Sequence, residues 1–407
     1  MKKYCIYIFL LFLVPFVKMS GQVDSLRISL LTCTPGSDAY AHFGHSAIRV
    51  RNLNTEEDVV FNYGMFNYRA ENFIYRFVKG ETDYELGAEY TRTFVMRYGI
   101  KGEGITEQVL NLDSDEAARL YYFIRVNYLP ENRVYRYNFL YDNCTTRARD
   151  MIEKAVEGGI VYDTKERKLT FREILAEFTN CSPWLGFGID FVLGEEVDRV
   201  VDRRKQMFIP SYYMHDADSA YIIRSDGSRV PLVAEKDVLL MELDKPENVQ
   251  EWSATVFTPL AVFVSLFVLA LIISWYDVKM GRVSWIFDAL LLFLQGAAGI
   301  VVAFLFFFSE HPAVGTNWLV VIFNPLPLVW LPFMIIKVIH KKQDGIYIAN
   351  MAVLTVFMIA MPCLPQCFNT AVVPLVSTLL LRSAVNVFVR QENKNRIKML
   401  FACKRCS

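Results

Sequence analysis

The chain has 407 residues, of which 53% are hydrophobic and 14% aromatic, and its 43 lysines and arginines balance its 43 aspartates and glutamates. This composition is too apolar for an ordinary soluble protein, and the zero net charge gives no basic bias toward nucleic acid. The sequence also lacks a glycine-rich phosphate loop of the P-loop or dinucleotide type. These observations exclude nucleic-acid partners and nucleotide-dependent chemistry, and we expect no cofactor.

The N-terminus has the pattern of a secretion signal. Two lysines follow the first methionine, an apolar stretch covers 4–17, and Ser20 and Gly21 supply small residues for cleavage. We expect a signal peptide over 1–21, with an uncleaved membrane anchor as the alternative. Lipidation of Cys33 is disfavoured because a threonine precedes it and the apolar stretch ends well before it.

Residues 22–245 have the charge density and the mixture of patterns expected of a globular α+β domain. Runs of aliphatic, β-branched and aromatic residues predict strands over 26–31, 46–51 and 59–63. A turn is expected to join the last two strands as a hairpin. Capping residues and apolar residues at helical spacing predict helices over 113–128 and 145–156.

Five apolar segments follow, each near the roughly 20 residues that cross a bilayer. We expect a juxtamembrane linker over 246–256, a membrane domain over 257–390 and a tail over 391–407. The predicted spans are 257–276, 285–308, 317–339, 346–368 and 370–390. The fifth span is the least regular because Pro374 and Arg382 lie inside it.

Charges at the ends of the spans predict their orientation. With the N-terminal domain outside, lysines and arginines gather in the inner loops and the tail, whereas the outer loops hold Glu310 and neither lysine nor arginine. This distribution follows the positive-inside rule and predicts a cytoplasmic tail. Asp288, the one acidic residue inside a predicted span, should face the interior of the bundle.

The eight cysteines fall into different regions of the chain. Five lie outside the exported domain: Cys5 in the signal peptide, Cys363 and Cys367 in the fourth span, and Cys403 and Cys406 as a CxxC pair in the tail. Cys33, Cys144 and Cys181 remain in the exported domain. One disulfide, if any, would join Cys33 to Cys181 and leave Cys144 as a free thiol, for which catalysis is a good reason.

Two short motifs, over 42–46 and 141–145, carry residues suited to thiol chemistry. Asp142 or Asn143 can cap the helix that begins in the second motif. The positive end of that helix would stabilise a Cys144 thiolate, and its free N–H groups could bind an oxyanion. The alternative is an inert buried cysteine beside a capped helix.

His45 is the predicted general base for Cys144, because a histidine on a strand facing a cysteine on a helix is the papain-type arrangement. His42 lies three residues earlier on the same strand-like stretch and should point to the opposite face. Asn62, on the next strand of the hairpin, is the candidate that orients the imidazole. A zinc site using both histidines and a cysteine is an alternative, but no metal-ligand spacing recurs, and we expect no metal.

A histidine strand that precedes an Asn–Cys helix start inverts the usual papain order. This order resembles the circularly permuted NlpC/P60 proteins, which include the lecithin:retinol acyltransferase group. The sequence resembles the Lnb lipoprotein N-acyltransferases of Gram-negative bacteria more closely still. The stretches that carry this resemblance are 43–50, 61–64, 138–147 and 183–190. The resemblance implies a circularly permuted papain-like (NlpC/P60-like) periplasmic domain followed by five inner-membrane helices.

The resemblance implies an apolipoprotein N-acyltransferase with a cysteine–histidine mechanism. Cys144 would take an acyl chain from a membrane phospholipid as a thioester, and the α-amine of a diacylglyceryl-cysteine lipoprotein would accept it, with His45 moving the protons. The expected partners are therefore phospholipids and diacylated lipoproteins. Arg147, Trp184 and His42 are candidates for substrate binding, although His42 could instead be structural. Arg147 could meet phosphate headgroups, with a solvated helix face as the alternative. Trp184 lies in an apolar stretch that could enter the membrane interface or line an acyl channel, with a core segment of the domain as the alternative.

Two other functional classes stay open. An NlpC/P60-type cell-wall peptidase or amidase anchored in the inner membrane would use the same residues, but it would not need five spans. A non-catalytic signalling or transport module would leave the cysteine with a structural role.

Overall fold

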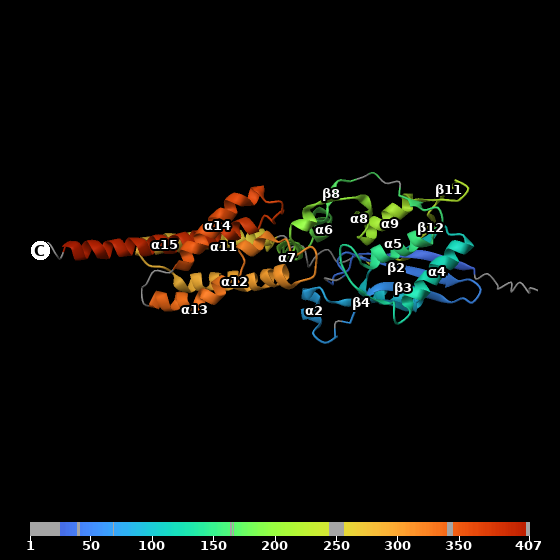
Figure 1. Ribbon diagram of the computed structural model, residues 1–407, viewed down its shortest axis with the longest axis horizontal. Coiled ribbons are helices and arrows are strands. Elements are labelled where there is room, and N and C mark those ends of the chain that lie inside the picture. Colours follow the sequence, from blue (N-terminus) through green and yellow to red (C-terminus); the bar gives the residue numbers. More distant parts are fainter. Residues whose placement is uncertain are drawn as a thin grey trace, which may run out of the picture.

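The computed structural model describes residues 25–38, 41–67, 69–162, 165, 167–243, 256–339 and 345–403. The predicted signal peptide, Cys406 and nearly all of the predicted linker lie outside the described residues. The molecule is elongated, with a bundle of long helices at one end and an α+β domain at the other (Figure 1). The predicted α+β class and the five helices of membrane-spanning length are confirmed.

The α+β domain is built on a seven-stranded antiparallel sheet in the order β12-β5-β1-β2-β3-β4-β6. The strands, in chain order, are β1 (Leu26–Cys33), β2 (His45–Asn52), β3 (Asp58–Met65), β4 (Asp83–Tyr90), β5 (Ile105–Leu110), β6 (Val134–Arg136) and β12 (Val233–Leu240).

Helices cover both faces of this sheet. On β1, Leu30 packs in the core shared with α4 (Ser114–Tyr128) and α5 (Cys144–Ala155), whereas the next residue, Leu31, packs in the core shared with α3 (Thr91–Lys101). A strand buried on both faces is a continuous apolar run rather than an alternation of apolar and polar residues.

The elements around the two motifs are close to those predicted. The predicted hairpin is β2 and β3, which pair with Ile48 opposite Phe61. The first predicted helix is α4, where Asp113 and Glu116 form a reciprocal capping box. The second predicted helix is α5, which begins one residue earlier than expected, so that Cys144 is its first residue.

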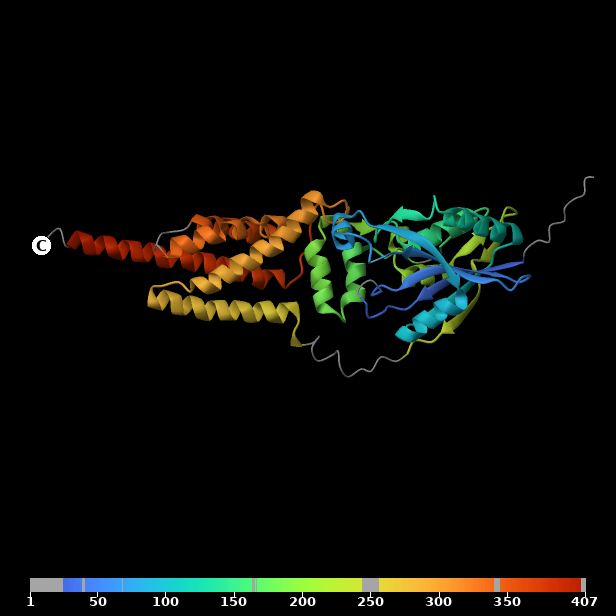
Figure 2. The same cartoon turned by 90° about the horizontal axis from the view of Figure 1, so that it is seen from below.

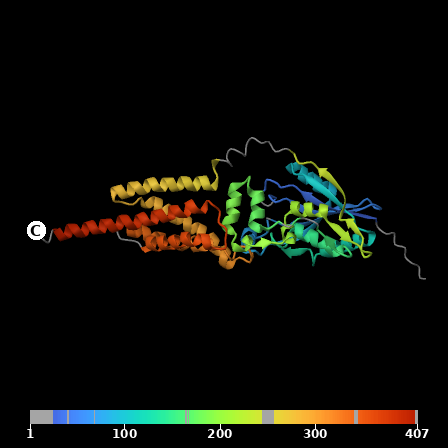
Figure 3. The same cartoon turned by 90° about the horizontal axis from the view of Figure 1, so that it is seen from above.

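Short elements lie between the sheet and the bundle. The helices α6 (Phe171–Thr179) and α7 (Pro183–Val192) run crosswise to the long helices at the end of the bundle (Figure 2, Figure 3). The remaining elements of the domain are α2 (Phe73–Lys79), β7 (Ile160–Val161), β8 (Leu169–Thr170), η1 (Glu195–Asp198), β9 (Val200–Val201), α8 (Arg203–Gln206), α9 (Pro210–Ser219), β10 (Tyr221–Ile223) and β11 (Arg229–Pro231).

The bundle contains α11 (Pro259–Met280), α12 (Trp285–Phe308), α13 (Leu326–Ile339), α14 (Gly345–Ala360) and α15 (Val372–Cys403), with short 3-10 turns at η2 (Trp318–Val321) and η3 (Met361–Cys363). The third predicted span, over 317–339, is confirmed as a candidate membrane span over Trp318–Val338, but η2 and α13 divide it. Asn324 precedes a proline, which disfavours helical backbone, and its side-chain oxygen instead accepts the N–H of Leu326 at 3.1 Å.

Hydrogen bonds fasten the domain to the bundle. In the loop after α12, the Glu310 N–H donates to the Lys79 carbonyl at 2.7 Å, and the Ala313 carbonyl accepts the Gly194 N–H at 2.7 Å. Asn369, just before α15, donates to the Asp190 carboxylate of α7 at 2.9 Å. These contacts come from segments far apart in the sequence, so they fix how the domain sits on the bundle.

A buried ion cluster holds three long helices together near the opposite end of the bundle. Arg382 of α15 binds Asp277 of α11 and Asp288 of α12, each at 2.7 Å, and donates to Ser274 at 3.0 Å. All three charged side chains are at most 2% exposed. Asp288 therefore faces the interior of the bundle, as predicted, where it balances the arginine that made the fifth span irregular.

Removal of the arginine should destabilise the bundle. Arg382→Met leaves two carboxylates buried without a counter-charge, which is expected to cost about 3–5 kcal/mol and to lower the apparent melting temperature in detergent. Lys279→Met, which removes an exposed lysine from the same end, should change stability by less than about 0.5 kcal/mol. Equal melting temperatures for the two variants would contradict the structural role of the cluster.

Candidate active site

Cys144, His45 and Asn62 meet where α5 begins against the sheet. Cys144 is the first residue of α5, His45 is the first residue of β2, and Asn62 lies on the neighbouring strand β3. The His45 ring hydrogen-bonds Cys144, and its Nε2 atom hydrogen-bonds the Asn62 side-chain oxygen. A thiol, an imidazole and an amide in this order are the parts of a papain-type site.

The start of α5 is fixed by Asn143, which is the residue that caps it. The Asn143 side-chain oxygen accepts the N–H groups of Thr145 and Thr146, both at 2.9 Å, and the Thr146 hydroxyl accepts the Asn143 N–H at 2.8 Å. Of the two capping candidates in the sequence, Asn143 is therefore the cap. The Asn143 side chain thus accepts the N–H groups of Thr145 and Thr146 but not that of Cys144.

The surroundings of Cys144 favour its thiolate. Burial is the largest influence and would raise the pKa of the thiol, but it is outweighed by the positive charge of His45 and by hydrogen bonds. These bonds come from the His45 ring, the Ser46 N–H and the Thr145 hydroxyl. Together they lower the pKa of Cys144 to about 7, which is the range expected of a reactive cysteine.

The partner histidine shifts in the opposite direction. Burial is again the largest influence and would lower the pKa of His45. The adjacent Cys144 charge, and the hydrogen bonds to Cys144 and Asn62, outweigh burial and raise the pKa of His45 above its usual value. A cysteine with a lowered pKa beside a histidine with a raised pKa forms a thiolate–imidazolium pair near neutral pH.

Cys33 is the contrasting thiol of the same sheet. It lies opposite His45 in the register of β1 and β2, and burial raises its pKa strongly. Cys33 and Cys181 are both free, Cys33 buried and Cys181 exposed. The disulfide considered from the sequence is therefore not formed, and Cys144 is a free thiol, as expected.

Gly64 and Tyr137, which the sequence did not single out as site residues, border the cysteine. Gly64 has a positive φ of 84°, and a Cβ atom placed on it would lie 3.6 Å from the Cys144 Cβ and 3.8 Å from the Tyr137 ring. Burial raises the pKa of Tyr137, so this phenol stays neutral beside the thiolate. The alternating tyrosines at 135 and 137, before the cysteine motif, were the available sequence signal.

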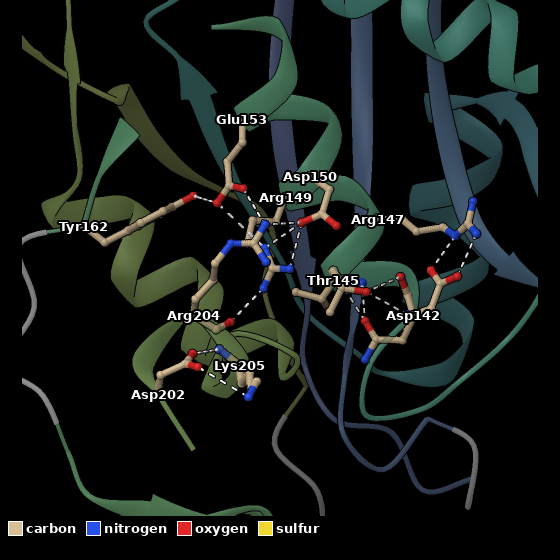
Figure 4. A network of polar contacts seen from close by, with 12 residues as sticks. Asp142, Thr145, Arg147, Arg149, Asp150, Glu153, Tyr162, Asp202, Arg204 and Lys205 are labelled. Carbon is tan, nitrogen blue, oxygen red and sulfur yellow. Dashed lines mark hydrogen bonds and ion pairs between the residues drawn. The ribbon is translucent and has the colours of Figure 1, made fainter. Parts of the chain in front are cut away.

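A network of ion pairs holds the rest of α5 in place (Figure 4). Arg149 donates to the Arg204 carbonyl and to Asp150, both at 2.7 Å. Arg204, on α8, binds Asp150 at 2.8 Å and Glu153 at 2.6 Å. These contacts tie the helix that carries Cys144 to a segment some fifty residues further along the chain.

The three predicted substrate-binding residues contact other partners. His42 hydrogen-bonds the Phe178 carbonyl at 2.8 Å. Arg147 forms a two-pronged ion pair with Asp142, and its guanidinium lies 3.5 Å from the centre of the Tyr135 ring.

The third of these residues, Trp184 on α7, donates to the Phe257 carbonyl, just before α11, at 2.6 Å. The stretch predicted to lie at the membrane interface is thus a helix that touches the start of the bundle.

The prediction that His42 lies on the same strand as His45 is wrong. Residues 41–43 form a turn, and β2 begins only at His45. Gly44 makes the junction possible, because a Cβ atom there would lie 2.7 Å from the Cys33 carbonyl oxygen. Within the described residues, no group of three or more His, Cys, Asp or Glu side chains is placed to hold a metal ion.

An α+β domain with a cysteine–histidine pair, joined to five helices of membrane-spanning length, defines a membrane protein with a thiol site outside its bundle. Residues 15–177 match the family model of the Lnb N-terminal periplasmic domain, and residues 250–394 match that of the Lnb transmembrane domain. The chain belongs to the Lnb family, which is known for lipoprotein N-acyltransferases, and its α+β domain is periplasmic. Comparison with curated proteins and with solved structures gave no match.

Alkylation of the protein by iodoacetamide should distinguish Cys144 from the other thiols. Because the thiolate is the reactive form, labelling of the Cys144 peptide should rise with pH through a midpoint near 7. His45→Gln removes the positive charge that opposes burial, so the midpoint should move above 9, the ordinary value for the thiol. Mass spectrometry measures labelling of the Cys144 peptide, and the peptide with the exposed Cys181 is the internal control. An unchanged midpoint in His45→Gln would contradict the ion pair.

Proposed function

We propose that this chain is an apolipoprotein N-acyltransferase that moves an acyl chain through a thioester on Cys144. The observation that carries the proposal is the contact of Cys144, His45 and Asn62 within a domain of the Lnb family. In this proposal the α+β domain is a circularly permuted papain-like fold, since His45 precedes the cysteine helix along the chain.

In the first half of the reaction, the Cys144 thiolate attacks the ester carbonyl carbon of a phospholipid. The Cys144 N–H and neighbouring dipoles at the start of α5 face the oxyanion of the tetrahedral intermediate. The carbon–oxygen bond then breaks, and the imidazolium of His45 gives its proton to the departing alkoxide. The products are a lysophospholipid and an acyl-thioester on Cys144, with His45 left neutral.

In the second half, the α-amine of a diacylglyceryl-cysteine attacks the thioester carbonyl. His45 accepts a proton from the attacking amine, and the carbon–sulfur bond breaks to restore the thiolate. In both halves of the reaction, the Asn62 side-chain oxygen bonds the Nε2 atom of His45 and holds the imidazole in one orientation. The product is an N-acyl amide, and the thiolate–imidazolium pair is regenerated.

The position of the domain suits two lipid substrates. Both substrates lie in the outer leaflet of the inner membrane, and α7 and the loop after α12 hold the domain directly against the bundle. Five crossings would carry the end of α15 to the cytoplasmic face, which agrees with the basic residues near the C-terminus. A cell-wall peptidase or amidase with the same site is the alternative, and it would act on a peptide bond beyond the membrane surface.

The proposal is tested in cells that lack their own lipoprotein N-acyltransferase. Expression of the wild-type chain should produce triacylated N-terminal peptides of lipoproteins, detected by mass spectrometry, and Cys144→Ala should produce none. Cys181→Ala, which removes an exposed cysteine of the same domain, should act as the wild type. Triacylated peptides at equal levels with Cys144→Ala would refute the thioester, and none with the wild type would favour the cell-wall alternative.

Asn62 should act on rate through the orientation of the imidazole. Asn62→Ala removes the hydrogen bond to Nε2, and a misplaced base is expected to lower kcat by about 10²-fold with a smaller change in KM. Asn62→Asp keeps an oxygen acceptor at the same position and should retain more activity than the alanine variant. An alanine variant with the kcat of the wild type would show that the imidazole does not need this contact.

A further inference from the structure

An apolar groove lies where the domain meets the outer surface of the bundle. Its volume is about 670 Å³, and it is lined mainly by apolar side chains of α2 and by one residue of α12, namely Phe73, Ile74, Tyr75, Val78 and Phe304. Figure 1 shows α2 beside the end of α12 that is nearest to the domain. The two helices touch through Tyr75 and Phe304, whose ring centres are 6.0 Å apart.

The groove adjoins apolar side chains at the end of α12, because Phe304, which lines it, lies 5.7 Å from Phe308 between ring centres. Ile74 of α2 is 77% exposed, and Phe307 and Phe308 at the end of α12 are 67% and 65% exposed. Exposed apolar side chains at the end of a membrane-spanning helix lie among acyl chains. The helix α2 belongs to the periplasmic domain, and it carries the same kind of exposed apolar surface. An ordinary soluble domain would have polar residues at such positions.

A row of aromatic rings leads from this groove to the cysteine. Phe73, which lines the groove, stacks on Phe66 at 5.6 Å between ring centres, and Phe66 lies 5.0 Å from Tyr84. Tyr84 stacks on Tyr137 at 4.1 Å. Tyr137 and Cys144 both border Gly64, since a Cβ atom placed there would lie 3.8 Å from the Tyr137 ring and 3.6 Å from the Cys144 Cβ, so the row ends beside the cysteine.

We propose that this groove receives the acyl chain of the phospholipid donor and that the aromatic row lines its course to Cys144. The inference rests on the proposed acyl transfer and assigns its donor site. The donor is favoured over the acceptor lipoprotein because the transferred chain is bonded to the carbon that Cys144 attacks, so this chain must lie along a surface that ends at the sulfur. Flat apolar rings give such a chain dispersion contacts without fixing its length.

The test places a charge in the groove and measures the first half of the reaction alone. Ile74→Glu puts a carboxylate against the donor chain, whereas Ile100→Glu puts one at an equally exposed isoleucine of α3, outside the groove lining (82% exposed). The purified full-length protein is placed in nanodiscs of phosphatidylethanolamine without any lipoprotein, and lysophospholipid release is followed by mass spectrometry. Ile74→Glu should slow this release by at least about tenfold, while Ile100→Glu should match the wild type.

A second measurement separates a blocked groove from a damaged site. Hydrolysis of p-nitrophenyl butyrate, whose short chain needs no groove, should be equal in the wild type and Ile74→Glu and absent in Cys144→Ala. A phospholipid with a photoreactive diazirine near the end of its chain should label peptides from α2 or Phe304 in Cys144→Ala, and the label should be lost in the double variant with Ile74→Glu.

The outcomes distinguish the groove from the chemistry. Lysophospholipid release by Ile74→Glu at the wild-type rate overturns the groove while leaving the acyl transfer intact. Normal release with a loss only when lipoprotein is added would assign the groove to the acceptor and overturn the donor assignment. Equal losses in both glutamate variants, or a parallel loss of butyrate hydrolysis, also overturn the groove. No release by the wild type overturns the acyl transfer and the groove together.

Discussion

A buried thiolate needs matched charges and donors, and in this chain that match depends on where α5 begins. Asn143 caps the start of α5 with its side-chain oxygen. Its side-chain N–H groups donate to the Phe139 and Phe208 carbonyls at 2.7 and 2.9 Å. One side chain therefore joins the helix start to two separate loops. For Cys33, also buried but on a strand, burial is the largest influence and raises the pKa of its thiol.

The second constraint is the fixed position of the domain on the bundle. Arg172 of α6 binds Asp190 at 2.8 Å and Asp198 at 2.7 Å, and it also donates to the Gly194 carbonyl. Asp190 in turn accepts from Asn369 of the bundle. Because this chain of contacts is part-buried and charge-assisted, the face of the domain that carries α2 stays against α12 instead of turning freely above the membrane.

Local sequence signals predicted the elements of the site better than its contacts. A cap and an apolar stripe marked α5, and a β-branched run marked β2, because these signals depend on neighbours within a turn or a strand. The turn before His45 was missed because an apolar and polar alternation does not distinguish a strand from a turn that precedes it.

Beyond the predicted contact of Cys144, His45 and Asn62, the long-range contacts around the site were not predicted from the sequence. Arg147 was a candidate for phosphate headgroups or for a solvated helix face, and its contacts with Asp142 and with Tyr135, a ring brought there by β6, were not predicted. Gly64 and Tyr137 border Cys144 only because the sheet and the loop before α5 come together. The break in the third span was missed because mean hydropathy does not weigh the Asn–Pro pair at 324–325.

Two buried charge clusters of the described residues differ in what a proton can do. In the bundle, Arg382 is paired with Asp277 and Asp288, and a guanidinium does not lose its proton in a protein, so Arg382 is a fixed charge that holds the helices together. At the end of the sheet, the pKa of Cys144 is lowered to about 7 and that of His45 is raised, so one proton can pass between them near neutral pH. The irregular fifth span and its partner acid are thus anchoring features, and the proposed acyl transfer is assigned to the cluster whose proton can move.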